Sequence, residues 1–401
     1  KMKAIVLGCG GNMGISTMAY LKEQDYINDI LLTEIDKPKL DQIMDWVNDE
    51  RFTGQILDAT DYDAMVEAMK GRDVVLNVSA LDDKMPAFKA ALEVGAHYLD
   101  PGFSHNEQLK YADEFKKKGL TAIVGMYYSP GLDNILAKYA IDRLDRVDSV
   151  DFRWSVVDIV PPEEHTRPLY WAISDIGRLI THHFGFPSRK LVNGQMIELP
   201  WRAEPEMFTY MGPVGTTEAR GLPGESLLYL HMNYPDIPNI TYKEALGIDF
   251  NKKCTFLAEL GFNRVDPIEI DGQSILPSKV IRYLAEHCQP PEEKKPGDIR
   301  HGGGVVVKGV KDGKKMEYNV QMWPSEELVA KNKAMGCAKI SRSGAFRNGS
   351  PLTSVAILIL KGLIKERGVF VPGLVEPPEE FIKQEVSMGQ SFAASETLLM
   401  G

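Results

Sequence analysis

Seven residues near the N-terminus, Gly8–Gly14 (GCGGNMG), have the composition of a phosphate-binding loop. They follow a short apolar run and open a helical pattern, which is the context in which such glycines bind a dinucleotide. Gly8 permits a tight turn, Gly10 lets the backbone approach a pyrophosphate, and Gly14 allows close helix packing. Amides at the helix start supply donors and partial positive charge. We predict cofactor contacts from Gly8, Gly10, Gly11, Asn12, Met13 and Gly14.

The spacing of these glycines departs from the usual fingerprint. GxGxxxG is one residue longer than GxGxxG, and Met13 stands where the third glycine is expected. The alternative is a flexible turn between strand and helix that binds nothing. The regular strand and helix alternation that surrounds the loop favours the ligand-binding interpretation.

Glu34 lies at the end of the second predicted strand, twenty residues after Gly14. A carboxylate at this point accepts both ribose hydroxyls of NAD and repels the 2′-phosphate of NADP. Asp36, with Lys37 and Lys39 nearby, leaves NADP possible. We therefore predict NAD in preference to NADP, the alternative being that Glu34 is an exposed acidic loop residue.

Polar residues also follow the third and fourth predicted strands. Asp58 can reach an adenine, and Asn77 and Ser79 can face the ribose or nicotinamide. Because any doubly wound fold places polar residues at the carboxyl edge of its sheet, position alone leaves these three cofactor contacts open.

The ends of the fifth and sixth predicted strands carry Asp100 and Tyr128, before the reversals Pro101–Gly102 and Pro130–Gly131. A substrate meets the nicotinamide at this edge of the sheet. Asp100 and Tyr128 are thus candidate catalytic residues, for proton transfer or for orienting an amine. The alternatives are a helix N-cap for Asp100 and core packing for Tyr128.

The elements that must position these residues are six short apolar runs that alternate with helical patterns, at residues 4–7, 30–32, 55–57, 74–78, 97–99 and 122–124. This alternation predicts a Rossmann-type, doubly wound parallel sheet, an α/β fold, over residues 1–148. From Val150 the pattern alternates apolar and polar residues, and 305–320 reads as a β-hairpin. We predict a second α/β domain with a mixed, largely antiparallel sheet over 149–349. An apolar helix near 352–363 returns to the first domain, within about 350–401.

Composition excludes several classes of protein. The net charge of −10 makes nucleic acid a poor partner and is compatible with a cationic amine. The four cysteines lie far apart, which argues against a zinc site or a disulfide framework, and we predict no metal. The longest apolar run, 355–360, is too short for a membrane span, and no apolar signal region precedes the first strand. A cytoplasmic, non-membrane protein is expected.

Five segments in one order, GCGGNMG, HYLD (97–100), SPGLDN (129–134), HTRPLYWAIS (165–174) and LKGLIKERGV (360–369), resemble the saccharopine dehydrogenase-like family, near its lysine 6-dehydrogenase and saccharopine reductase branches. The resemblance covers nearly the whole chain and is densest in the first 140 residues. It implies a Rossmann domain, a second domain for substrate binding and dimerisation, and a homodimer or higher homo-oligomer. It also implies NAD(P)-linked oxidation or formation of a C–N bond on an amino acid.

The resemblance carries over to individual residues only in part. Saccharopine reductases have an aspartate where this chain has Ser129. Arg167 replaces a neutral amide of the family pattern and could hold a substrate carboxylate in a bidentate fork. His165 is the candidate that titrates near neutral pH, the alternative being a loop histidine.

Three further residues have more ordinary interpretations. His182 and His183 sit in a helical pattern and are expected to be structural. Arg220 could meet an acidic substrate group or simply pair with Glu218.

Together these observations predict an NAD(P)-dependent amino-acid dehydrogenase that oxidises a C–N bond of a small-molecule substrate such as lysine. The first alternative is the reductive direction, condensation of an amino acid with an aldehyde, of the saccharopine or carboxyspermidine type. The second is a non-catalytic NAD-binding regulatory protein, which a fold alone does not exclude.

Overall fold

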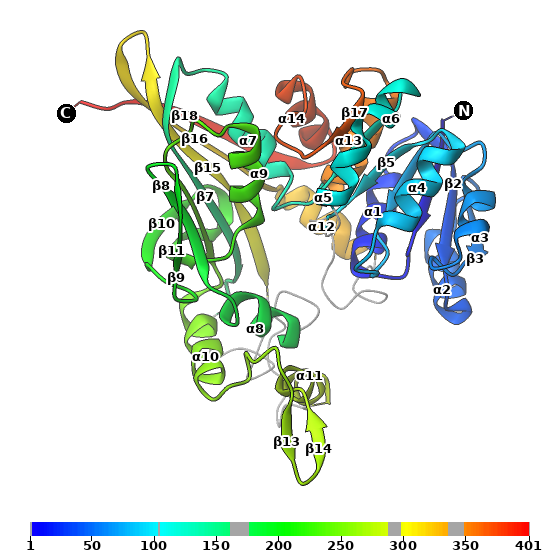
Figure 1. Ribbon diagram of the computed structural model, residues 1–401, viewed down its shortest axis with the longest axis horizontal. Coiled ribbons are helices and arrows are strands. Elements are labelled where there is room, and N and C mark those ends of the chain that lie inside the picture. Colours follow the sequence, from blue (N-terminus) through cyan, green and yellow to red (C-terminus); the bar gives the residue numbers. More distant parts are fainter. Residues whose placement is uncertain (1, 103–104, 161–175, 288–297, 336–348, 401) are drawn as a thin grey trace. The chain divides into compact units, whose positions relative to one another are not determined.

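The computed structural model describes residues 2–102, 105–160, 176–287, 298–335 and 349–400. The chain forms two compact units (Figure 1). Unit 1 comprises Lys1–Tyr139 and Pro324–Ser391, and unit 2 comprises Ala140–Trp323 and Phe392–Gly401. The first crossing between units therefore lies at residue 139, before β7 (Arg146–Asp158), in which residue 148 already belongs to the second sheet.

Unit 1 is built on a seven-stranded sheet in the order β17-β6-β5-β4-β1-β2-β3, and all its pairings are parallel. This order reverses direction at β1 and β4, as in a doubly wound fold, so the predicted Rossmann architecture is confirmed. The first six strands are β1 (Met2–Leu7), β2 (Ile27–Glu34), β3 (Phe52–Ile56), β4 (Val74–Asn77), β5 (His97–Asp100) and β6 (Thr121–Val124).

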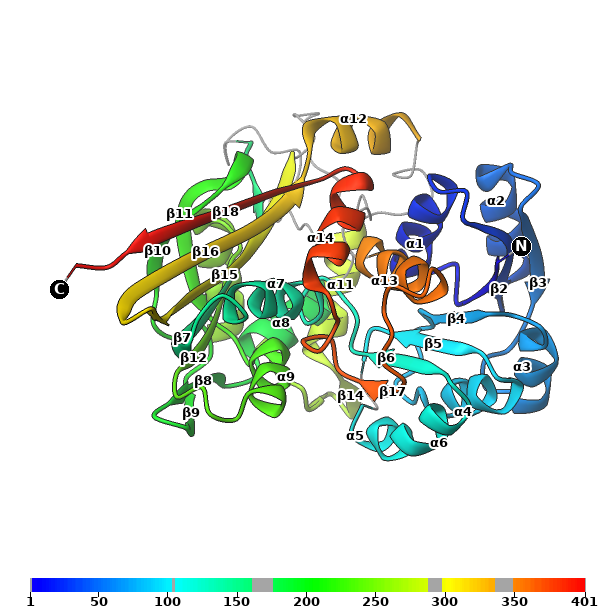
Figure 2. The same cartoon turned by 90° about the horizontal axis from the view of Figure 1, so that it is seen from above.

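Helices cover both faces of this sheet (Figure 2). Local signals set their ends: Asp36 accepts a hydrogen bond from the Lys39 amide before α2, and Gly95, at φ 82°, ends α4. The helices between the strands are α1 (Asn12–Lys22), α2 (Lys37–Val47), α3 (Tyr62–Met69), α4 (Met85–Val94), α5 (His105–Gln108), α6 (Ala112–Lys117) and α7 (Leu132–Ile141).

The C-terminal part of the chain completes unit 1. It contributes α12 (Glu326–Ala334), α13 (Ser350–Leu360), β17 (Gly368–Phe370) and α14 (Pro378–Ser387). Nearly every residue of α13 is buried, which explains why the helix is apolar all round, and it packs against α1 and α14. Strand β17, which pairs with β6, was not predicted from the sequence. Its three residues are too few to show the alternation of apolar and polar side chains that identifies a strand.

Unit 2 contains the predicted second sheet, which is mixed and mostly antiparallel. Its main path runs β10-β11-β12-β7-β15-β16-β18, with β8 and β9 beside β12, and β12 pairs with β7 in parallel. The hairpin at 305–320 turns at Asp312 and Gly313, both at positive φ. The strands are β7, β8 (Ser188–Val192), β9 (Gln195–Leu199), β10 (Glu206–Tyr210), β11 (Gly215–Gly221), β12 (Ile240–Ala245), β15 (Ile299–Lys311), β16 (Lys314–Pro324) and β18 (Gln390–Leu398).

The end of the chain departs from the predicted organisation. From Phe392 onward it belongs to unit 2, because β18 joins the sheet beside β16 rather than remaining with the C-terminal helices. Unit 2 also carries α8 (Ile176–Phe184), α9 (Glu225–Asn233), α10 (Ile248–Glu259), α11 (Pro277–His287) and a small hairpin, β13 (Ile268–Ile270) and β14 (Gln273–Ile275). No helix among the described residues is long and apolar enough to cross a membrane.

Candidate active site

The glycine loop between β1 and α1 is held by backbone contacts on both sides. The amides of Gly8 and Cys9 donate to the Thr33 carbonyl of β2, at 3.1 and 3.0 Å. Gly8 has φ 78°, and a Cβ there would lie 2.5 Å from the Ser79 Cα. Glycine at position 8 is thus needed both for the turn and for the close approach of the chain after β4.

Gly14 has the packing role that the sequence predicted, despite the longer spacing. Helix α1 begins at Asn12, so the additional residue of the motif falls in the first helical turn. A Cβ on Gly14 would lie 2.5 Å from the Cys9 carbonyl oxygen. The third glycine is therefore displaced by one position but still lets the helix pack against the loop.

The N-terminus of α1 fits a dinucleotide diphosphate. Gly11 is the N-cap residue of α1 and makes no side-chain cap hydrogen bond. Among the described residues, the nearest atom to a Cβ built on Gly11 is the Gly8 carbonyl oxygen at 3.7 Å, an ordinary van der Waals contact, so the backbone is not crowded at this glycine. An open concave turn with amide donors at a helix start is the structure that a pyrophosphate requires.

Glu34 lies across the glycine loop. One carboxylate oxygen accepts a hydrogen bond from the Gly10 amide at 2.8 Å, and the other accepts from the Ile35 amide at 2.9 Å. A Cβ on Gly10 would overlap the Glu34 carboxylate and approach the Lys39 Cγ to 3.0 Å. Both an acid and a base thus flank the turn where the adenosine ribose of a dinucleotide lies in this fold.

The Cys9 thiol is not a reactive group. Its side chain is fully buried, and burial, with the nearby Glu34 charge, raises the pKa of the thiol to about 12. A thiol that stays protonated is a poor nucleophile, so the glycine loop offers backbone donors rather than sulfur chemistry.

The predicted contacts after β3 and β4 lie in different environments. Asp58 is exposed and accepts from the Thr60 amide (2.9 Å) and hydroxyl (2.7 Å), which lower its pKa. Asn77 is buried: its amide donates to the Tyr98 hydroxyl at 2.9 Å and its carbonyl accepts from the Ser79 hydroxyl at 2.8 Å. Ser79, half-buried beside Gly8, is the more accessible of the last two.

Lys84 was missed by the sequence analysis. Its side chain is 1% exposed, and its ammonium donates to the Ser79 carbonyl at 2.5 Å. The segment ALDDK gives no local sign of burial, since lysine between acidic residues and a helix start is usually solvated. Lys84 therefore fixes the turn that follows β4, next to the glycine loop.

Asp100 is buried completely and its carboxylate holds two loops. It accepts from the Gly102 amide at 2.7 Å, from the Gln108 side chain at 2.6 Å and from the Gly125 amide at 3.3 Å. Burial raises the pKa of Asp100, and the hydrogen bonds oppose this shift. Because all these hydrogen bonds are made inside unit 1, they favour a structural role for Asp100. Asp100 links the turns after β5 and β6 and does not act as the helix N-cap that was the predicted alternative.

Tyr128 also points into unit 1. The side chain is 5% exposed, and its hydroxyl donates to the side-chain amide oxygen (Oε1) of Gln390 at 3.2 Å. This environment matches the packing alternative. The following turn is fixed by Asp133, which accepts from the Ser129 hydroxyl at 2.6 Å and from the Gly131 amide at 3.1 Å.

The remaining candidates lie in or near unit 2. His165 and Arg167 lie outside the described residues. His183 contacts the Leu179 carbonyl at 3.1 Å and the Glu244 carboxylate at 2.8 Å, as a structural histidine does. Burial lowers the pKa of the neighbouring His182 to about 4.

Arg220 pairs with Glu218 at 2.7 Å, which is the simpler of its two predicted roles.

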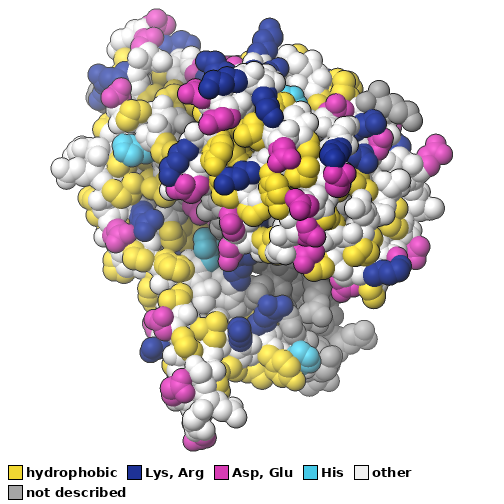
Figure 3. Space-filling model, turned by 45° about the vertical axis from the view of Figure 1, so that its right-hand side comes forward, with side chains coloured by type: hydrophobic (Ala, Val, Ile, Leu, Met, Phe, Trp, Pro, Cys, Tyr) yellow, Lys and Arg dark blue, Asp and Glu magenta, His cyan; other side chains and the backbone are white. Residues whose placement is uncertain are grey.

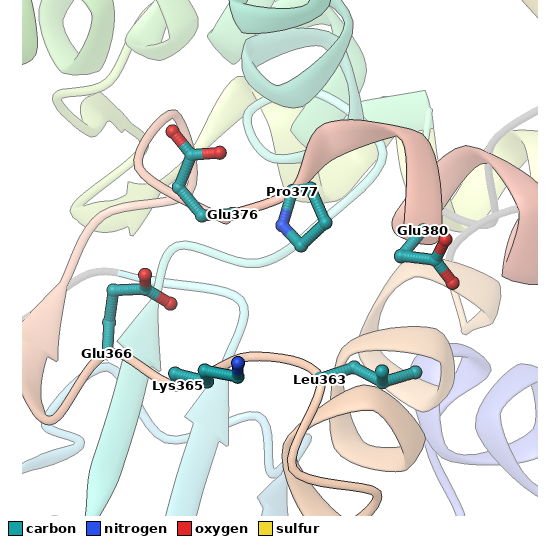
Figure 4. A pocket seen from close by; sticks show the side chains of 6 residues that line it. All are labelled: Leu363, Lys365, Glu366, Glu376, Pro377 and Glu380. Atoms are coloured by element: carbon teal, nitrogen blue, oxygen red, sulfur yellow. The ribbon is translucent and has the colours of Figure 1, made fainter.

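A pocket of about 260 Å³ lies at the opposite edge of the unit 1 sheet (Figure 4). Its lining comes from the segment before β17 and from the start of α14: Leu363, Lys365, Glu366, Glu376, Pro377 and Glu380. Because β17 runs parallel to the other strands, residues before it lie at the amino edge, whereas the glycine loop lies at the carboxyl edge. This pocket is therefore separate from the dinucleotide site.

Comparison with known proteins agrees with this geometry. Residues 4–123 match the family model of the saccharopine dehydrogenase NADP-binding domain. The predicted resemblance to the saccharopine dehydrogenase-like family is confirmed. The region matched contains the glycine loop, Glu34 and the first six strands, so the predicted cofactor class, NAD or NADP, is confirmed as well.

Two relatives extend the similarity over the whole chain. Carboxyaminopropylagmatine dehydrogenase of Synechocystis is 23% identical and covers 96% of each chain. Carboxynorspermidine synthase of Vibrio cholerae is 20% identical and covers 97% of this chain and 95% of the relative. The chain is thus similar, over nearly its full length, to a dehydrogenase and a synthase whose names both denote carboxylated polyamines.

Solved structures with the same fold include saccharopine dehydrogenase (L-Glu forming) of Saccharomyces cerevisiae. It has a TM-score of 0.74 at 14% identity and covers 99% of this chain and 100% of its own. Homospermidine synthase of Legionella pneumophila, solved in complex with NAD, has a TM-score of 0.66 at 12% identity and covers 99% and 92%. At these identities the likeness establishes a shared fold over nearly the whole chain.

Proposed function

We propose that this chain catalyses the NAD(P)-linked reductive condensation of an amine with an aldehyde that carries an amino-acid group. The observation that carries this proposal is the full-length similarity to two relatives whose names denote carboxylated polyamines. The net charge of −10 agrees with a cationic amine as one substrate. The proposal takes the reductive direction that the sequence analysis gave as its first alternative, but it places the amino-acid group on the aldehyde instead of on the amine. Oxidation of an amino acid such as lysine is the opposite direction of the same kind of chemistry.

The reaction balances without any further reagent. The amine nitrogen attacks the aldehyde carbon and water leaves, which gives an imine. A hydride adds to the imine carbon and a proton adds to nitrogen, which gives a secondary amine. The bound nicotinamide supplies that hydride. The protein must therefore bind two substrates, exclude water from the imine and deliver a proton.

The described residues account for the cofactor half of this task. Amides at the start of α1 bind the diphosphate, and Glu34, held at the Gly10 amide, accepts the ribose hydroxyls. Asp100 and Asp133 keep the turns after β5 and β6 in place. These turns form the carboxyl edge of the sheet, where the reacting carbon lies in a doubly wound fold.

The substrate half rests on residues outside the described ranges. We assign the substrate carboxylate to Arg167, because a guanidinium binds a carboxylate through two parallel hydrogen bonds. We assign proton transfer near neutral pH to His165. Unit 2 as a whole is proposed to hold the amine substrate.

The purified chain should be incubated with NADH or NADPH, and with agmatine or a diamine together with an amino-acid aldehyde. Loss of absorbance from the reduced nicotinamide, dependent on both substrates, is expected. A parallel assay with NAD or NADP and a panel of amino acids tests lysine oxidation. Cofactor binding without turnover in either assay would instead support the non-catalytic, regulatory alternative.

A further inference from the structure

Four polar side chains, here called the polar relay, form a continuous series of hydrogen bonds across the carboxyl ends of β4 and β5. The Ser79 hydroxyl lies 2.8 Å from the Asn77 Oδ1, and the Asn77 Nδ2 lies 2.9 Å from the Tyr98 hydroxyl. The Tyr98 hydroxyl is in turn hydrogen-bonded to the Asp100 carboxylate. Asn77, Tyr98 and Asp100 are at most 1% exposed, whereas Ser79 is half-buried, so Ser79 is the member that a ligand can approach.

The direction of each hydrogen bond in the relay follows from the chemistry of its atoms. The Ser79 backbone amide donates to the Asn77 Oδ1 at 3.3 Å, which fixes this atom as the oxygen and Nδ2 as the donor. Because an amide oxygen has no proton, the Ser79 hydroxyl must donate its single proton to Oδ1. Nδ2 donates to the Tyr98 oxygen, and the Tyr98 proton goes to Asp100. All three hydrogen bonds therefore point from Ser79 toward Asp100.

Asp100 anchors the relay at its buried end. Its carboxylate accepts three N–H hydrogen bonds from residues that follow β5 and β6, and it is therefore an acceptor for the Tyr98 hydroxyl as well. Burial, together with the Asp100 charge, keeps the pKa of Tyr98 well above its usual range, so the phenol retains the proton that it donates. Buried hydrogen bonds in series polarise one another, which favours a single direction along the relay.

The accessible end of the relay is consequently an acceptor. The one proton of the Ser79 hydroxyl is committed to Asn77, so this oxygen offers lone pairs to any other group that it meets. A ligand that contacts the Ser79 oxygen must then be a hydrogen-bond donor. This requirement would not hold for a serine whose hydroxyl could rotate.

The backbone of Ser79 is restrained as well. Figure 3 shows lysine and arginine side chains on the surface of the molecule, whereas Lys84 is 1% exposed and donates to the Ser79 carbonyl at 2.5 Å. Burial of an ammonium costs free energy, and this hydrogen bond offsets part of the cost. On its other side Ser79 packs against Gly8, where a Cβ would lie 2.5 Å from the Ser79 Cα. The Ser79 oxygen is therefore held next to the glycine loop.

The order of the strands relates Ser79 to one half of a dinucleotide. Glu34 ends β2, which pairs with β1 on one side, and Ser79 follows β4, which pairs with β1 on the other. A dinucleotide crosses a doubly wound sheet at this switch point, with its diphosphate at the glycine loop. With the adenosine ribose at Glu34, the nicotinamide ribose falls on the side of β4, and its hydroxyls are hydrogen-bond donors.

We propose that Tyr98 is a positioning residue of the cofactor site, which acts through Asn77 to keep the Ser79 oxygen as an acceptor for a hydroxyl of the nicotinamide ribose. Asp100 fixes Tyr98, and Lys84 fixes the backbone of Ser79. Neither Tyr98 nor Asp100 contacts the cofactor. The inference rests on the NAD(P) class of cofactor and not on the reaction proposed above, because its readout is binding.

Calorimetric titration of the full chain tests the proposal, with NAD or NADP, whichever wild type binds more tightly, and with ADP or its 2′-phosphate, which lack the nicotinamide ribose. Tyr98→Phe should weaken dinucleotide binding by about tenfold and leave binding of the ADP fragment within about twofold. Ser79→Ala should show the same pattern, and Ser79→Thr, which keeps a hydroxyl, should restore the affinity. Tyr26→Phe is the matched control, because its hydroxyl donates to the Leu360 carbonyl at 3.0 Å, before β2. Both of its affinities should equal those of wild type.

The ratio of the two affinities separates positioning from a merely structural role. If Tyr98 only stabilised the fold, Tyr98→Phe would lower the melting temperature and leave this ratio unchanged, which would overturn the proposal. A changed ratio in Ser79→Ala but not in Tyr98→Phe would overturn it too. Should Tyr98→Phe fail to fold, Asn77→Leu, of nearly the same volume as asparagine, breaks the relay at the next residue. An unchanged ratio in that variant would refute the relay.

Discussion

The Glu34 carboxylate accepts a hydrogen bond from the Gly10 amide at 2.8 Å, and this bond links the end of β2 to the glycine loop. The carboxylate that we propose to bind the ribose is thereby positioned by the loop that we propose to bind the diphosphate. Lys39 lies on the same side of Gly10, because its Cγ and the Glu34 carboxylate would both contact a Cβ at position 10. A lysine at this place could favour a 2′-phosphate. We propose that the balance of these two side chains decides whether the chain prefers NAD or NADP.

Replacing Glu34 by alanine should weaken NAD binding and shift the NAD/NADP affinity ratio toward NADP by about tenfold, or about 1.4 kcal/mol. The reason is that the ribose hydroxyls lose their acceptor while Lys39 remains. Calorimetric titration with each cofactor measures the ratio. Asp41→Ala, which removes an exposed carboxylate paired with Lys37, serves as control. An unchanged ratio in Glu34→Ala would remove Glu34 from the site.

Alanine at two glycines of the loop should have different effects. Gly14→Ala forces a Cβ onto the Cys9 backbone and should reduce the free energy of unfolding by about 1–3 kcal/mol. Gly11→Ala adds a methyl group that makes only an ordinary van der Waals contact with the Gly8 carbonyl oxygen, so this variant should fold normally. It should bind NAD(P) roughly tenfold more weakly, because the methyl group would occupy the proposed diphosphate cradle at the start of α1. Thermal unfolding and cofactor titration separate the two. Normal cofactor affinity in Gly11→Ala would contradict the proposed cradle.

Asp100→Asn distinguishes a structural from a catalytic aspartate. An amide in place of the carboxylate turns a donor toward the Gly102 amide or the Gln108 side chain. The variant should lose about 1–3 kcal/mol of stability, since a buried donor is left without an acceptor. A catalytic role predicts the reverse, an unchanged melting temperature with a large loss of kcat. Comparing the two readouts in one preparation decides between them.

Stability should depend on pH through Glu385, which is fully buried on α14. Its oxygens accept from the hydroxyls of Ser350 (2.7 Å) and Ser354 (2.5 Å), yet burial dominates and raises the pKa to about 7. The folded protein therefore binds this proton more tightly than the unfolded chain. The contribution of Glu385 to the free energy of unfolding is greatest below about pH 4.5 and falls as the pH rises to 7. The total change in the free energy of unfolding is about 3 kcal/mol.

Glu385→Gln should remove this dependence, and should be more stable than wild type above pH 7. Melting temperatures at pH 5 and pH 8 measure the effect. Glu380→Gln on the same helix is the control and should follow wild type, because Glu380 is only half-buried and pairs with Lys383 at 2.6 Å. A parallel pH profile for wild type and Glu385→Gln would show that Glu385 is not the titrating group.

Arg167→Lys should raise KM for the carboxylate-bearing substrate by about tenfold and leave KM for the amine unchanged, because lysine cannot form the bidentate contact. Initial rates with each substrate varied in turn measure the two constants. An unaltered KM for the carboxylate substrate would exclude Arg167 from its recognition.

Much of the first unit follows from local patterns in the chain. Apolar runs and glycines predicted the first six strands of unit 1. The strand–loop–helix context of Gly8–Gly14 indicated a dinucleotide cofactor from the sequence alone. These features are predictable because short strands buried on both faces and tight turns each demand particular residue types at fixed spacing. The helix observed at 350–360 was also predictable from the sequence. A helix that is apolar on every side must be buried on every side, and nearly all residues of α13 are buried.

Roles of single polar residues could not be predicted in this way. Asp100 has the position of a catalytic acid, but donors from Gln108 and Gly125 turn it inward, and nothing local to Asp100 encodes their approach. Lys84 is buried although its neighbours are charged. Burial and hydrogen-bond partners are properties of segments that are distant in sequence and meet only when the chain has folded.

The sequence by itself thus determined the Rossmann fold, the cofactor class and the helix that returns to the first domain, because each depends on backbone conformation and periodic burial. Only the tertiary structure decided that β17 completes the first sheet and that β18 joins the second. Which side chains are covered and which remain exposed depends on packing between distant elements, and a linear pattern does not contain that information.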